Sequence, residues 1–360
     1  MKVVTVLGTR PEIIKLSPLI PLLDAEFEQV LVHTGQHYSW EMDQMFFQEL
    51  QVREPDYNLN VGSGRHGEQT GKIMLELERV LLKEKPDLLI VLGDTNSTLA
   101  AAVVGSKLGC KVVHLEAGCR SRNRYQPEEI NRIVADHCAD ILFTIDTEST
   151  DNLLKEGLKQ EQIFYVGNIV EEACFRAITL SNVSKNVFVE VSDDEVSERK
   201  GNILVTIHRA ENTDNPARLR NIVEALNILS EKASVVFPIH PRTKKVLSEN
   251  KIRLSAKVKV LEPQGYAAFV SLLSKCSVVI TDSGGVLEEA TFLNVPALIP
   301  REKTELHELI DQGKAFLVGT NTGDLVKAAE EQLSRKIVKT ELQNPAISSK
   351  IVDILKRCKV

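Results

Sequence analysis

Positive charge is not in excess in this sequence, and that absence excludes one class of function. The 360 residues include 44 Lys and Arg against 50 Asp and Glu, for a formal net charge of −6 at pH 7. Sequence-independent binding of nucleic acid needs many cations that face the phosphates. We therefore expect a small-molecule partner and no nucleic acid.

Paired cysteines and metal-binding histidine motifs are also absent. The six cysteines are scattered and form no Cys-x-x-Cys pair, which favours reduced, buried thiols over disulfides or a zinc site. No His-x-His or His-Glu-x-x-His spacing occurs. We expect no metal and no other cofactor.

Long hydrophobic runs are lacking throughout the chain. The first run, Val3 to Leu7, stops at Gly8 and is too short for a signal peptide. No later stretch approaches the length of a membrane span, and no repeat has a solenoid period. Together with the reduced thiols, this predicts a cytoplasmic protein that does not engage a membrane.

What the sequence does contain is an alternation of short β-branched runs with helical patterns. This alternation is typical of parallel βαβ units, and 360 residues are too many for one typical core. We therefore expect two doubly wound, Rossmann-like α/β domains that face a central cleft. The expected strands cover residues 3–7, 88–92, 111–114, 202–206, 234–238, 257–261, 277–280, 296–299 and 315–318.

The domain boundary is expected upstream of the restart of this alternation, near a polar stretch at residues 181–201. We assign residues 1–172 to an N-terminal domain and 173–345 to a C-terminal, nucleotide-binding domain. The last helix, 346–360, has one apolar side and is expected to pack back on the first domain. Two other apolar stripes are expected in the core: Ile73, Met74, Leu77, Val80 and Leu81, and Ile130, Ile133, Val134, Cys138 and Ile141.

Acidic and phosphate-binding residues follow several of the expected strands. In open α/β sheets, ligands bind beyond the carboxyl ends of the strands, so residues placed there converge on one cleft. The segments are Gly8-Thr9-Arg10-Pro11-Glu12, Gly93-Asp94-Thr95, Leu115-Glu116-Ala117-Gly118 and Thr281-Asp282-Ser283-Gly284-Gly285. This pattern predicts an enzyme.

The first of these segments has the features of an anion site. Gly8 permits a tight turn, and Pro11 pre-sets the first turn of a helix. Free N–H groups there, with the charges of Arg10 and Lys15, would attract a phosphate. A solvated first turn is the alternative.

The segment at Ser283 is the second expected anion site. Its hydroxyl lies where a helix begins, and Gly284 and Gly285 let the backbone approach a diphosphate. Glu288 or Glu289, one turn into the helix, would accept hydrogen bonds from a ribose, although a simple capping pair is the alternative. The glycines at 62–67 match the dinucleotide fingerprint, but no buried strand precedes them, so nicotinamide binding is not expected.

Three carboxylates, Asp94, Glu116 and Glu128, are expected to carry the chemistry. The first two end neighbouring strands, and Glu128 lies in the first turn of a helix that should open beside them. Carboxylates gathered in a partly dry cleft acquire spread pKa values, so one can take a proton and another can give one. Taken singly, each would more often be a helix cap or the partner of a nearby arginine.

Two histidines repeat this arrangement in the second half of the chain. His208 and His240 each follow an expected strand and lie close to Arg209 and Arg242. Phosphate contact or assistance to a leaving group is the preferred role, and a structural histidine is the alternative.

Taken together, these motifs resemble those of the non-hydrolysing UDP-N-acetylglucosamine 2-epimerases, relatives of the two-domain GT-B glycosyltransferases. In order they read GTRPEIIKLSPLI, HTGQHY, GDTNSTLAA, HLEAGCRS, PEEINR, TIHRAEN, HPRT and TDSGGVLEEA, and they cover nearly the whole chain. The resemblance implies a GT-B fold, an isomerase and a UDP-sugar substrate. It also implies a homodimer. The products of such enzymes feed the synthesis of surface polysaccharides or protein glycans.

The resemblance implies a mechanism as well. Such enzymes interconvert UDP-N-acetylglucosamine and UDP-N-acetylmannosamine by anti elimination of UDP to 2-acetamidoglucal, followed by re-addition of UDP. By resemblance, the acid–base set is Asp94, Glu116 and Glu128, and His208 supports the departing UDP. The residues expected to bind the UDP-sugar are Arg10, Lys15, His240, Ser283, Gly284, Gly285 and Glu289.

Three segments depart from the bacterial pattern. The stretch at 304–308 looks more like relatives that act on UDP-2,3-diacetamido-2,3-dideoxyglucuronate. Residues 38–42 and 66–70 differ from the allosteric substrate site of the bacterial enzymes, where Gln36 and Gln69 match but Glu68 replaces an Arg. The diacetamido uronate is therefore the alternative substrate. A GT-B glycosyltransferase and a non-catalytic nucleotide-sugar sensor are the more distant alternatives.

Overall fold

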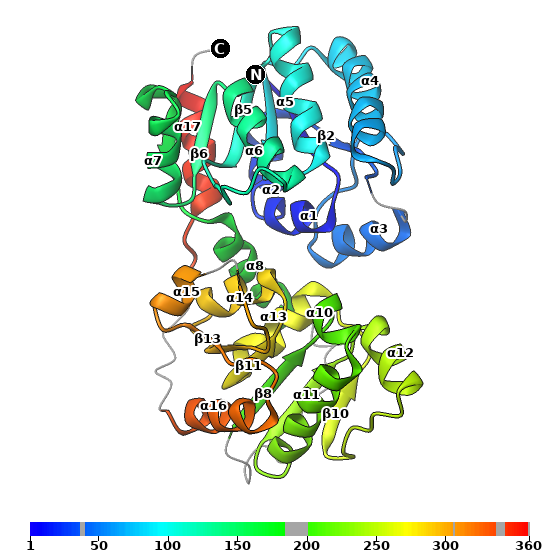
Figure 1. Cartoon of the computed structure of the whole chain (residues 1–360). Helices are drawn as coiled ribbons and strands as arrows, with labels where there is room; N and C mark the ends of the chain where they lie inside the picture. Colours follow the sequence, from blue (N-terminus) through cyan, green and yellow to red (C-terminus); the bar gives the residue numbers. More distant parts are fainter. Residues whose placement is uncertain (37–39, 184–200, 305–306, 336–342, 359–360) are drawn as a thin grey trace. The chain divides into compact units, whose positions relative to one another are not determined.

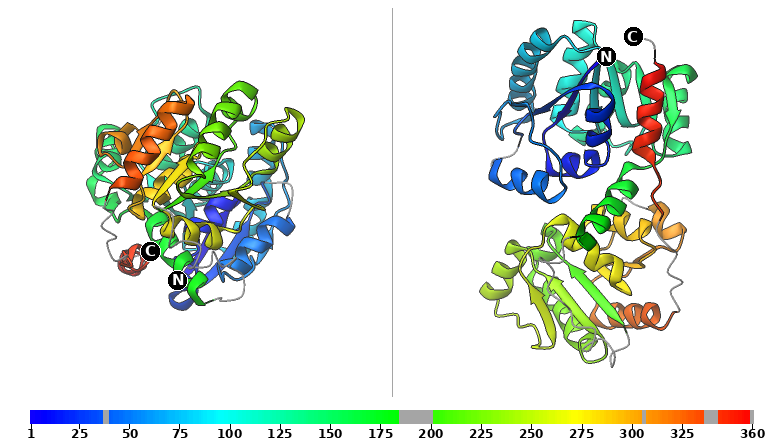
Figure 2. Two further views of the ribbon diagram at one scale, coloured as in Figure 1. Left: turned by 90° about the horizontal axis from the view of Figure 1, so that it is seen from below. Right: turned by 180° about the vertical axis from the view of Figure 1, so that it is seen from behind.

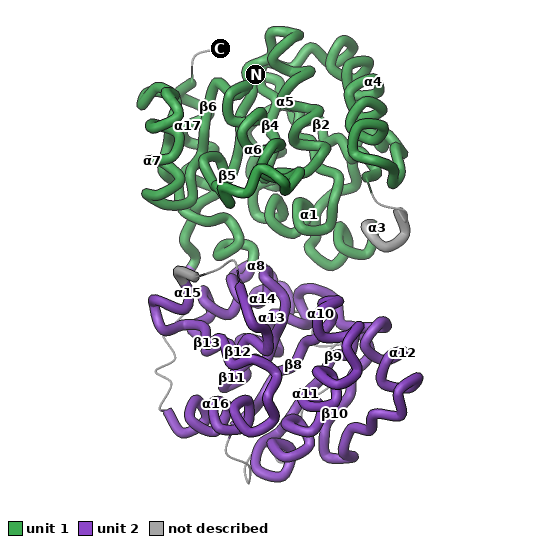
Figure 3. The backbone as a smooth tube through the Cα atoms, viewed as in Figure 1, with its two compact units in different colours: residues 1–173, 344–360 green, residues 174–343 purple. Residues whose placement is uncertain are grey.

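The chain forms two α/β units in the computed structural model, which describes residues 1–36, 40–183, 201–304, 307–335 and 343–358. Unit 1 comprises Met1–Ala173 and Asn344–Val360, and unit 2 comprises Cys174–Gln343 (Figure 3). Each unit has its own parallel sheet, flanked by helices (Figures 1 and 2). The predicted α/β class with two doubly wound sheets is confirmed.

The unit 1 sheet has the strand order β3-β2-β1-β4-β5-β6-β7 within the described residues, and all neighbours pair in parallel. Its strands are β1 (Lys2–Leu7), β2 (Glu28–His33), β3 (Tyr57–Asn58), β4 (Leu88–Leu92), β5 (Lys111–Ala117), β6 (Ile141–Thr144) and β7 (Ile163–Tyr165). Its α-helices are α1 (Arg10–Leu16), α2 (Ile20–Glu26), α3 (Trp40–Glu49), α4 (His66–Glu84), α5 (Asn96–Leu108), α6 (Pro127–Cys138), α7 (Thr147–Lys155) and α17 (Ile347–Arg357). A 3-10 turn, η1 (Gln160–Gln162), precedes β7, and α8 (Ile169–Val183) runs from unit 1 into unit 2.

The unit 2 sheet has the order β10-β9-β8-β11-β12-β13, again parallel, in the part of the chain that the structure describes. Its strands are β8 (Asn202–Thr206), β9 (Ser234–Pro238), β10 (Val258–Leu261), β11 (Val278–Thr281), β12 (Ala297–Ile299) and β13 (Ala315–Leu317). Its helices are α10 (Ala210–Thr213), α11 (Pro216–Leu229), α12 (Pro241–Glu249), α13 (Tyr266–Lys275), α14 (Gly284–Phe292), α15 (His307–Asp311) and α16 (Thr322–Ser334).

Both faces of the unit 2 sheet are buried, which explains why its strands are continuously apolar rather than alternating. Ile203 and Val205 of β8 join one core cluster with α11 and α16 residues, whereas Leu204 joins a second cluster with α13 and α14 residues. Successive side chains of a strand point to opposite faces, so helices on both sides require apolar residues at every position.

Helix α6 departs from the expected apolar stripe. Ile130, Ile133 and Val134 are only partly buried, and Ile141 belongs to β6 rather than to the helix. The fully buried positions of α6 include Glu129 and Asp136. The stripe assigned to the core was therefore wrong for α6, because this helix turns two carboxylates into unit 1.

The C-terminal helix α17 belongs to unit 1, where it contacts α2. Ile351 and Leu355 are buried, and the Ser348 N–H donates to Glu172 Oε2 at 2.6 Å. Lys356 forms an ion pair with Glu26 of α2. None of the described helices is long and apolar enough to cross a membrane.

Candidate functional site

Each sheet reverses its strand order at one point, and several of the predicted site residues, among them Asp94, His208 and Ser283, follow the strands on either side of it. In unit 1 the reversal lies between β1 and β4, and in unit 2 it lies between β8 and β11, which are labelled in Figure 1. Helices that leave neighbouring strands in opposite directions open a crevice at such a point, where ligands of doubly wound sheets bind. The strand order thus gives one candidate ligand-binding position in each unit.

Two of the three predicted carboxylates lie together in unit 1. Asp94 follows β4, and Glu116 lies within β5 at a bulge rather than after the strand. A Cβ built on Gly93 would lie 3.6 Å from Glu116 Oε2, so the Glu116 carboxylate borders the Asp94 loop. Glu116 has φ +64°, a left-handed conformation that non-glycine residues adopt at a cost of about 1 kcal/mol or more.

The third carboxylate, Glu128, is exposed in the first turn of α6. It precedes Arg132 by four residues, so both lie on one face of the helix. Arg132 forms an ion pair with Asp94, and this pair brings the Glu128 face of α6 toward the Asp94 loop. Glu128 itself is placed by its helix alone.

Asp94 and Glu116 are both ion-paired. Asp94 pairs with Arg132, whose side chain also contacts Glu129 at 3.1 Å, and Glu116 Oε2 lies 2.7 Å from Lys15 Nζ. Neither carboxylate is sealed, since the side chain of Asp94 is 31% exposed and that of Glu116 is 14% exposed. Accessible carboxylates of this kind can receive a proton from a bound sugar.

The segment after β1 differs from the expected anion site. Lys15 lies in the last turn of α1 and contacts Glu116, while the Arg10 guanidinium lies 5.7 Å from the centre of the Phe46 ring. Lys15 therefore acts on the charge of a carboxylate, and this contact was not expected from the sequence.

Glu12, in the first turn of α1, is a buried acid to which the sequence analysis gave no role. Its buried carboxylate accepts hydrogen bonds from the Gly8 N–H at 2.9 Å, the Thr9 hydroxyl at 2.8 Å and the Thr95 hydroxyl at 3.0 Å. Burial raises the pKa of Glu12 to about 7, against these donors. The signal was the Thr-x-x-Glu spacing of a capping box.

Glu129 is a second residue that sequence reasoning missed. It accepts hydrogen bonds from the Ser121 N–H at 2.8 Å and the Arg122 N–H at 2.9 Å, which fixes the loop that follows Glu116. These bonds and Arg132 outweigh burial and lower the pKa of Glu129. An acidic pair in the first turn of a helix, Glu128 and Glu129, was the available signal.

In unit 2, Asp282 organises the loop that carries His208. The fully buried Asp282 carboxylate accepts the His208 N–H at 3.0 Å, the Arg209 N–H at 3.1 Å and the Asn212 amide at 3.0 Å. His208 Nδ1 lies 3.4 Å from Asp282 Oδ1. Asp282 is therefore a support for the other loop and not a ligand-facing acid.

The two predicted histidines lie together, with ring centres 5.7 Å apart. His240 caps α12, where its Nδ1 accepts the Arg242 N–H at 3.1 Å. Burial, with the charges of His208 and Arg242, lowers the pKa of His240. His240 is thus a neutral imidazole beside the partly buried His208.

The glycines after β11 leave the start of α14 open. Ser283 is the N-cap residue, and neither Gly284 nor Gly285 has a positive φ, so the backbone conformation does not require glycine. A Cβ at Gly285 would meet nothing within 4 Å, and one at Gly284 would lie 3.7 Å from the Arg209 guanidinium. The missing side chains keep helix N–H groups accessible beside a cation, which suits a phosphate.

Glu289, one turn into α14, lies against Tyr266 of α13. Burial raises the pKa of Glu289 to about 8, although a hydrogen bond from the Tyr266 hydroxyl opposes this. Glu288 adds a like charge that also raises it.

We expect Glu289→Gln to stabilise ligand-free unit 2 at high pH only. The unfolded carboxyl loses its proton near pH 4.5 and the folded one near 8, so the folded state is penalised progressively as pH rises between these values. The gain at pH 8.5 should be about 1–2 kcal/mol, less than the full shift implies because the carboxyl is partly solvated. Denaturant unfolding at pH 5 and pH 8.5 measures it, with Glu249→Gln, on the exposed surface of α12, as the control. An equal effect of Glu289→Gln at both pH values would contradict the assignment.

The residues that match the family's allosteric site make internal contacts. Gln69 Nε2 donates to Gly62 O at 2.8 Å and Gln36 O at 3.1 Å, and the Ser97 hydroxyl donates to Gln36 Oε1 at 2.7 Å. Glu68 pairs with Lys72 at the surface. Residues 37–39 and 305–306, within two of the segments that depart from the bacterial pattern, lie outside the described residues.

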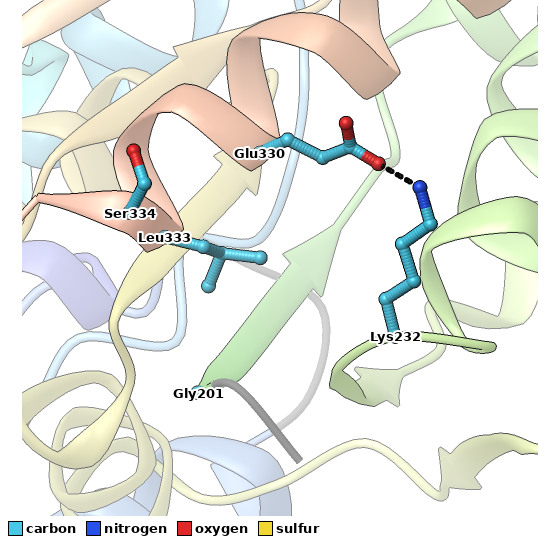
Figure 4. A pocket seen from close by; sticks show the side chains of 5 residues that line it. All are labelled: Gly201, Lys232, Glu330, Leu333 and Ser334. Atoms are coloured by element: carbon cyan, nitrogen blue, oxygen red, sulfur yellow. Dashed lines mark hydrogen bonds and ion pairs between the residues drawn. The ribbon is translucent and has the colours of Figure 1, made fainter.

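A pocket of about 640 Å³ lies elsewhere in unit 2 (Figure 4). It is lined by Gly201, Lys232, Glu330, Leu333 and Ser334. Gly201 precedes β8, so the pocket is at the amino end of the sheet, opposite to the end where α/β sheets bind ligands. No group of three or more His, Cys, Asp or Glu residues able to hold a metal occurs among the described residues.

Comparisons with known proteins agree on one family. The family model described as UDP-N-acetylglucosamine 2-epimerase matches residues 23–356. The UDP-N-acetylglucosamine 2-epimerase of Methanocaldococcus jannaschii is 46% identical over 93% of each chain. The UDP-2,3-diacetamido-2,3-dideoxy-D-glucuronate 2-epimerase of Pseudomonas aeruginosa is 41% identical over 94% of each chain.

Solved structures show the same architecture. The crystal structure of the M. jannaschii UDP-GlcNAc 2-epimerase in complex with UDP-GlcNAc and UDP superposes with a TM-score of 0.80 at 44% identity, covering 99% of this chain and 100% of that one. The fold is accordingly GT-B-like. With this match in sequence, coverage and fold, the chain belongs to the UDP-N-acetylglucosamine 2-epimerase family, a family of isomerases.

Proposed function

We propose that this enzyme interconverts UDP-N-acetylglucosamine and UDP-N-acetylmannosamine. The observation that carries the proposal is the adjacency of Asp94 and Glu116 beside the switch point of unit 1, each ion-paired and each accessible. The bound ligands of the M. jannaschii structure, UDP-GlcNAc and UDP, support the substrate class.

The reaction begins with removal of the proton from C2 of the sugar by one carboxylate of unit 1. The C2 proton is not acidic by itself, because no carbonyl adjoins it, so it leaves only as the C1–O bond to UDP breaks. The C–H electron pair forms the C1–C2 double bond of 2-acetamidoglucal, and the C1–O pair departs with UDP. A second carboxylate then returns a proton to the opposite face of C2 while a UDP oxygen re-forms the bond to C1.

The residues of unit 2 are proposed to bind UDP. Gly284, Gly285 and the Ser283 hydroxyl offer donors to the diphosphate, and Arg209 lies beside them. His208 stabilises the departing diphosphate. His240, whose ring centre lies 5.7 Å from that of His208, acts beside it as a neutral hydrogen-bond donor. Glu289 accepts hydrogen bonds from the ribose hydroxyls, which favours its ionised form in the complex.

Arg10 and Lys15 are the residues of unit 1 that we propose to take part in binding the UDP-sugar. Lys15 holds the charge of Glu116, and Arg10 is proposed to contact the diphosphate. The homodimer remains a prediction, which light scattering of the purified enzyme tests directly.

The reaction predicts solvent deuterium at C2 of the product. In heavy water, UDP-N-acetylglucosamine should yield UDP-N-acetylmannosamine with deuterium at C2, because the second carboxylate delivers a proton that it has taken from the solvent. NMR spectra of the product measure the incorporation, and enzyme with Asp94→Asn is the blank. Turnover without deuterium at C2 would exclude the elimination.

UDP-2,3-diacetamido-2,3-dideoxyglucuronate is the second candidate substrate. The 41% identity to the P. aeruginosa enzyme favours it, since this relative is named for that sugar. Separate incubations with the two UDP-sugars, followed by NMR of the epimers, decide between them. The preferred substrate should give at least tenfold higher kcat/KM.

A further inference from the structure

His114 is a fully buried histidine with a hydrogen-bond partner on each ring nitrogen. It lies on β5, two residues before Glu116, and its side chain is 0% exposed. Nδ1 lies 2.7 Å from Asp136 Oδ1, and Nε2 lies 2.8 Å from the carbonyl oxygen of Gly93. The proposed acid–base chemistry makes no direct use of either His114 or Asp136.

Both partners of His114 are acceptors, which determines its protonation. Asp136 is an ionised carboxylate, because its Oδ2 lies 2.7 Å from the Arg120 guanidinium and accepts the Gly118 N–H at 3.2 Å. A peptide carbonyl can only accept. A neutral imidazole has one N–H, so two acceptors require the doubly protonated imidazolium.

The surrounding charges support this form. Burial alone would lower the pKa of His114, but Asp136, the Gly93 carbonyl and the charge of Glu116 together raise it. Burial would raise the pKa of Asp136, but His114 and Arg120 lower it. Arg120 also pairs with Glu156 at 2.7 Å, so the four charged groups are balanced.

The His114–Asp136 pair touches every element that carries a proposed acid–base carboxylate. His114 holds the carbonyl of Gly93, which precedes Asp94 and has φ +71°. Asp136 holds the N–H of Gly118, two residues after Glu116, and lies on α6, the helix that begins with Glu128. Glu116 keeps its left-handed conformation only where the surroundings determine it.

We propose that His114 is a permanently protonated positioning residue, which with Asp136 sets the geometry of the Asp94 and Glu116 loops for proton transfer at C2. The proposal rests on the proposed epimerase function. The measurement of the protonation state of His114 needs no substrate. A failure of this proposal can therefore be distinguished from a failure of the proposed function.

The first test is the protonation state of His114 in the wild-type enzyme. In 15N–1H spectra of protein labelled with [15N]histidine, His114 should show two protonated ring nitrogens at pH 7. His33 is an internal reference, since it is also buried but its Nδ1 accepts the Gly35 N–H at 3.1 Å, which requires a neutral ring. A neutral ring at His114 at pH 7 would overturn the proposal.

The second test separates positioning from binding. His114→Gln and Asp136→Asn should each lower kcat about 10–100-fold, because small displacements of reacting groups have effects of that size. KM and the Kd for UDP should change less than threefold, since neither residue touches the nucleotide. His137→Gln, on the exposed side of α6, is the matched control and should keep wild-type kcat.

A purely structural pair would behave differently. It would lower the unfolding midpoint while kcat per folded molecule stayed at the wild-type value, and that result would overturn the proposal. In a positioning pair, the double variant His114→Gln/Asp136→Asn should lose no more kcat than either single variant, because the two act as a unit. The acidic limb of the kcat profile should also move to higher pH in His114→Gln, where a positive charge beside the carboxylates is lost. If a variant does not fold, the wild-type spectrum still decides the charge state on which the proposal depends.

Discussion

Asp94→Asn is expected to lower kcat for epimerisation about 10³-fold, with the Kd for UDP unchanged within about twofold. An amide cannot take or return a proton at neutral pH, so the chemical step fails. The local structure should survive, because the Asp94 carbonyl still accepts the Asn131 amide at 2.8 Å and Gly93 N–H still donates to the Leu115 carbonyl at 3.0 Å. NMR assay of the two UDP-sugars measures kcat, and titration calorimetry measures UDP binding.

The matched control for this variant is Asp151→Asn, which makes the same change at an exposed position on α7. It should keep wild-type kcat. An Asp94→Asn enzyme with more than about a tenth of wild-type kcat would remove Asp94 from the acid–base set. Equal losses of kcat and UDP affinity would instead indicate a damaged fold.

Asp282→Asn should produce the largest combined loss of stability and of UDP affinity, and this loss should arise in unit 2. In the wild-type enzyme, the buried Asp282 carboxylate accepts the N–H groups of His208 and Arg209. The variant replaces one carboxylate oxygen by an amide N–H₂, which cannot accept a hydrogen bond from them. Hydrogen bonds to a buried charge contribute strongly, and donors left facing a donor lose their partner. We expect the free energy of unfolding of unit 2 to fall by about 3 kcal/mol and the Kd for UDP to rise at least about 30-fold, because the His208 loop loses its support.

Asp214→Asn is the control for this prediction. Asp214 pairs with Arg242 at 2.6 Å, but its side chain is 57% exposed, and exposed ion pairs contribute about 0–1 kcal/mol. Denaturant unfolding and calorimetry compare the two variants. Similar stability for Asp282→Asn and the wild type would show that the buried contacts of Asp282 do not hold the loop.

The regular elements could be predicted from sequence because their signals are local. The apolar runs at 88–92 and 202–206 coincide with β4 and β8. Four strands of unit 1, β2, β3, β6 and β7, were not identified. The two or three residues of β3 and β7 carry too little pattern, and Ile141 of β6 was assigned to the stripe of the preceding helix. The expected α6 stripe failed because helical periodicity does not say which side faces the sheet.

Local sequence does not fix the order of the strands, because the single hand of parallel crossovers determines only which face of the sheet each helix covers. The tertiary structure places the loops after β1, β4, β8 and β11 at the two switch points. The sequence predicts that Asp94, His208 and Ser283 follow strands, but not that these strands flank the switch points.

By itself, the sequence determined the fold class, the strands that carry the site and the residue types at their ends, because these depend on neighbours along the chain. Only the tertiary structure decided which charged side chains form ion pairs: Lys15 with Glu116, Arg132 with Asp94, and His114 with Asp136. Residues 22 to 101 positions apart form these pairs, and a charge is stabilised by whatever the packed chain brings within about 4 Å of it. Burial and charge state are properties of that packing, and no local pattern encodes them.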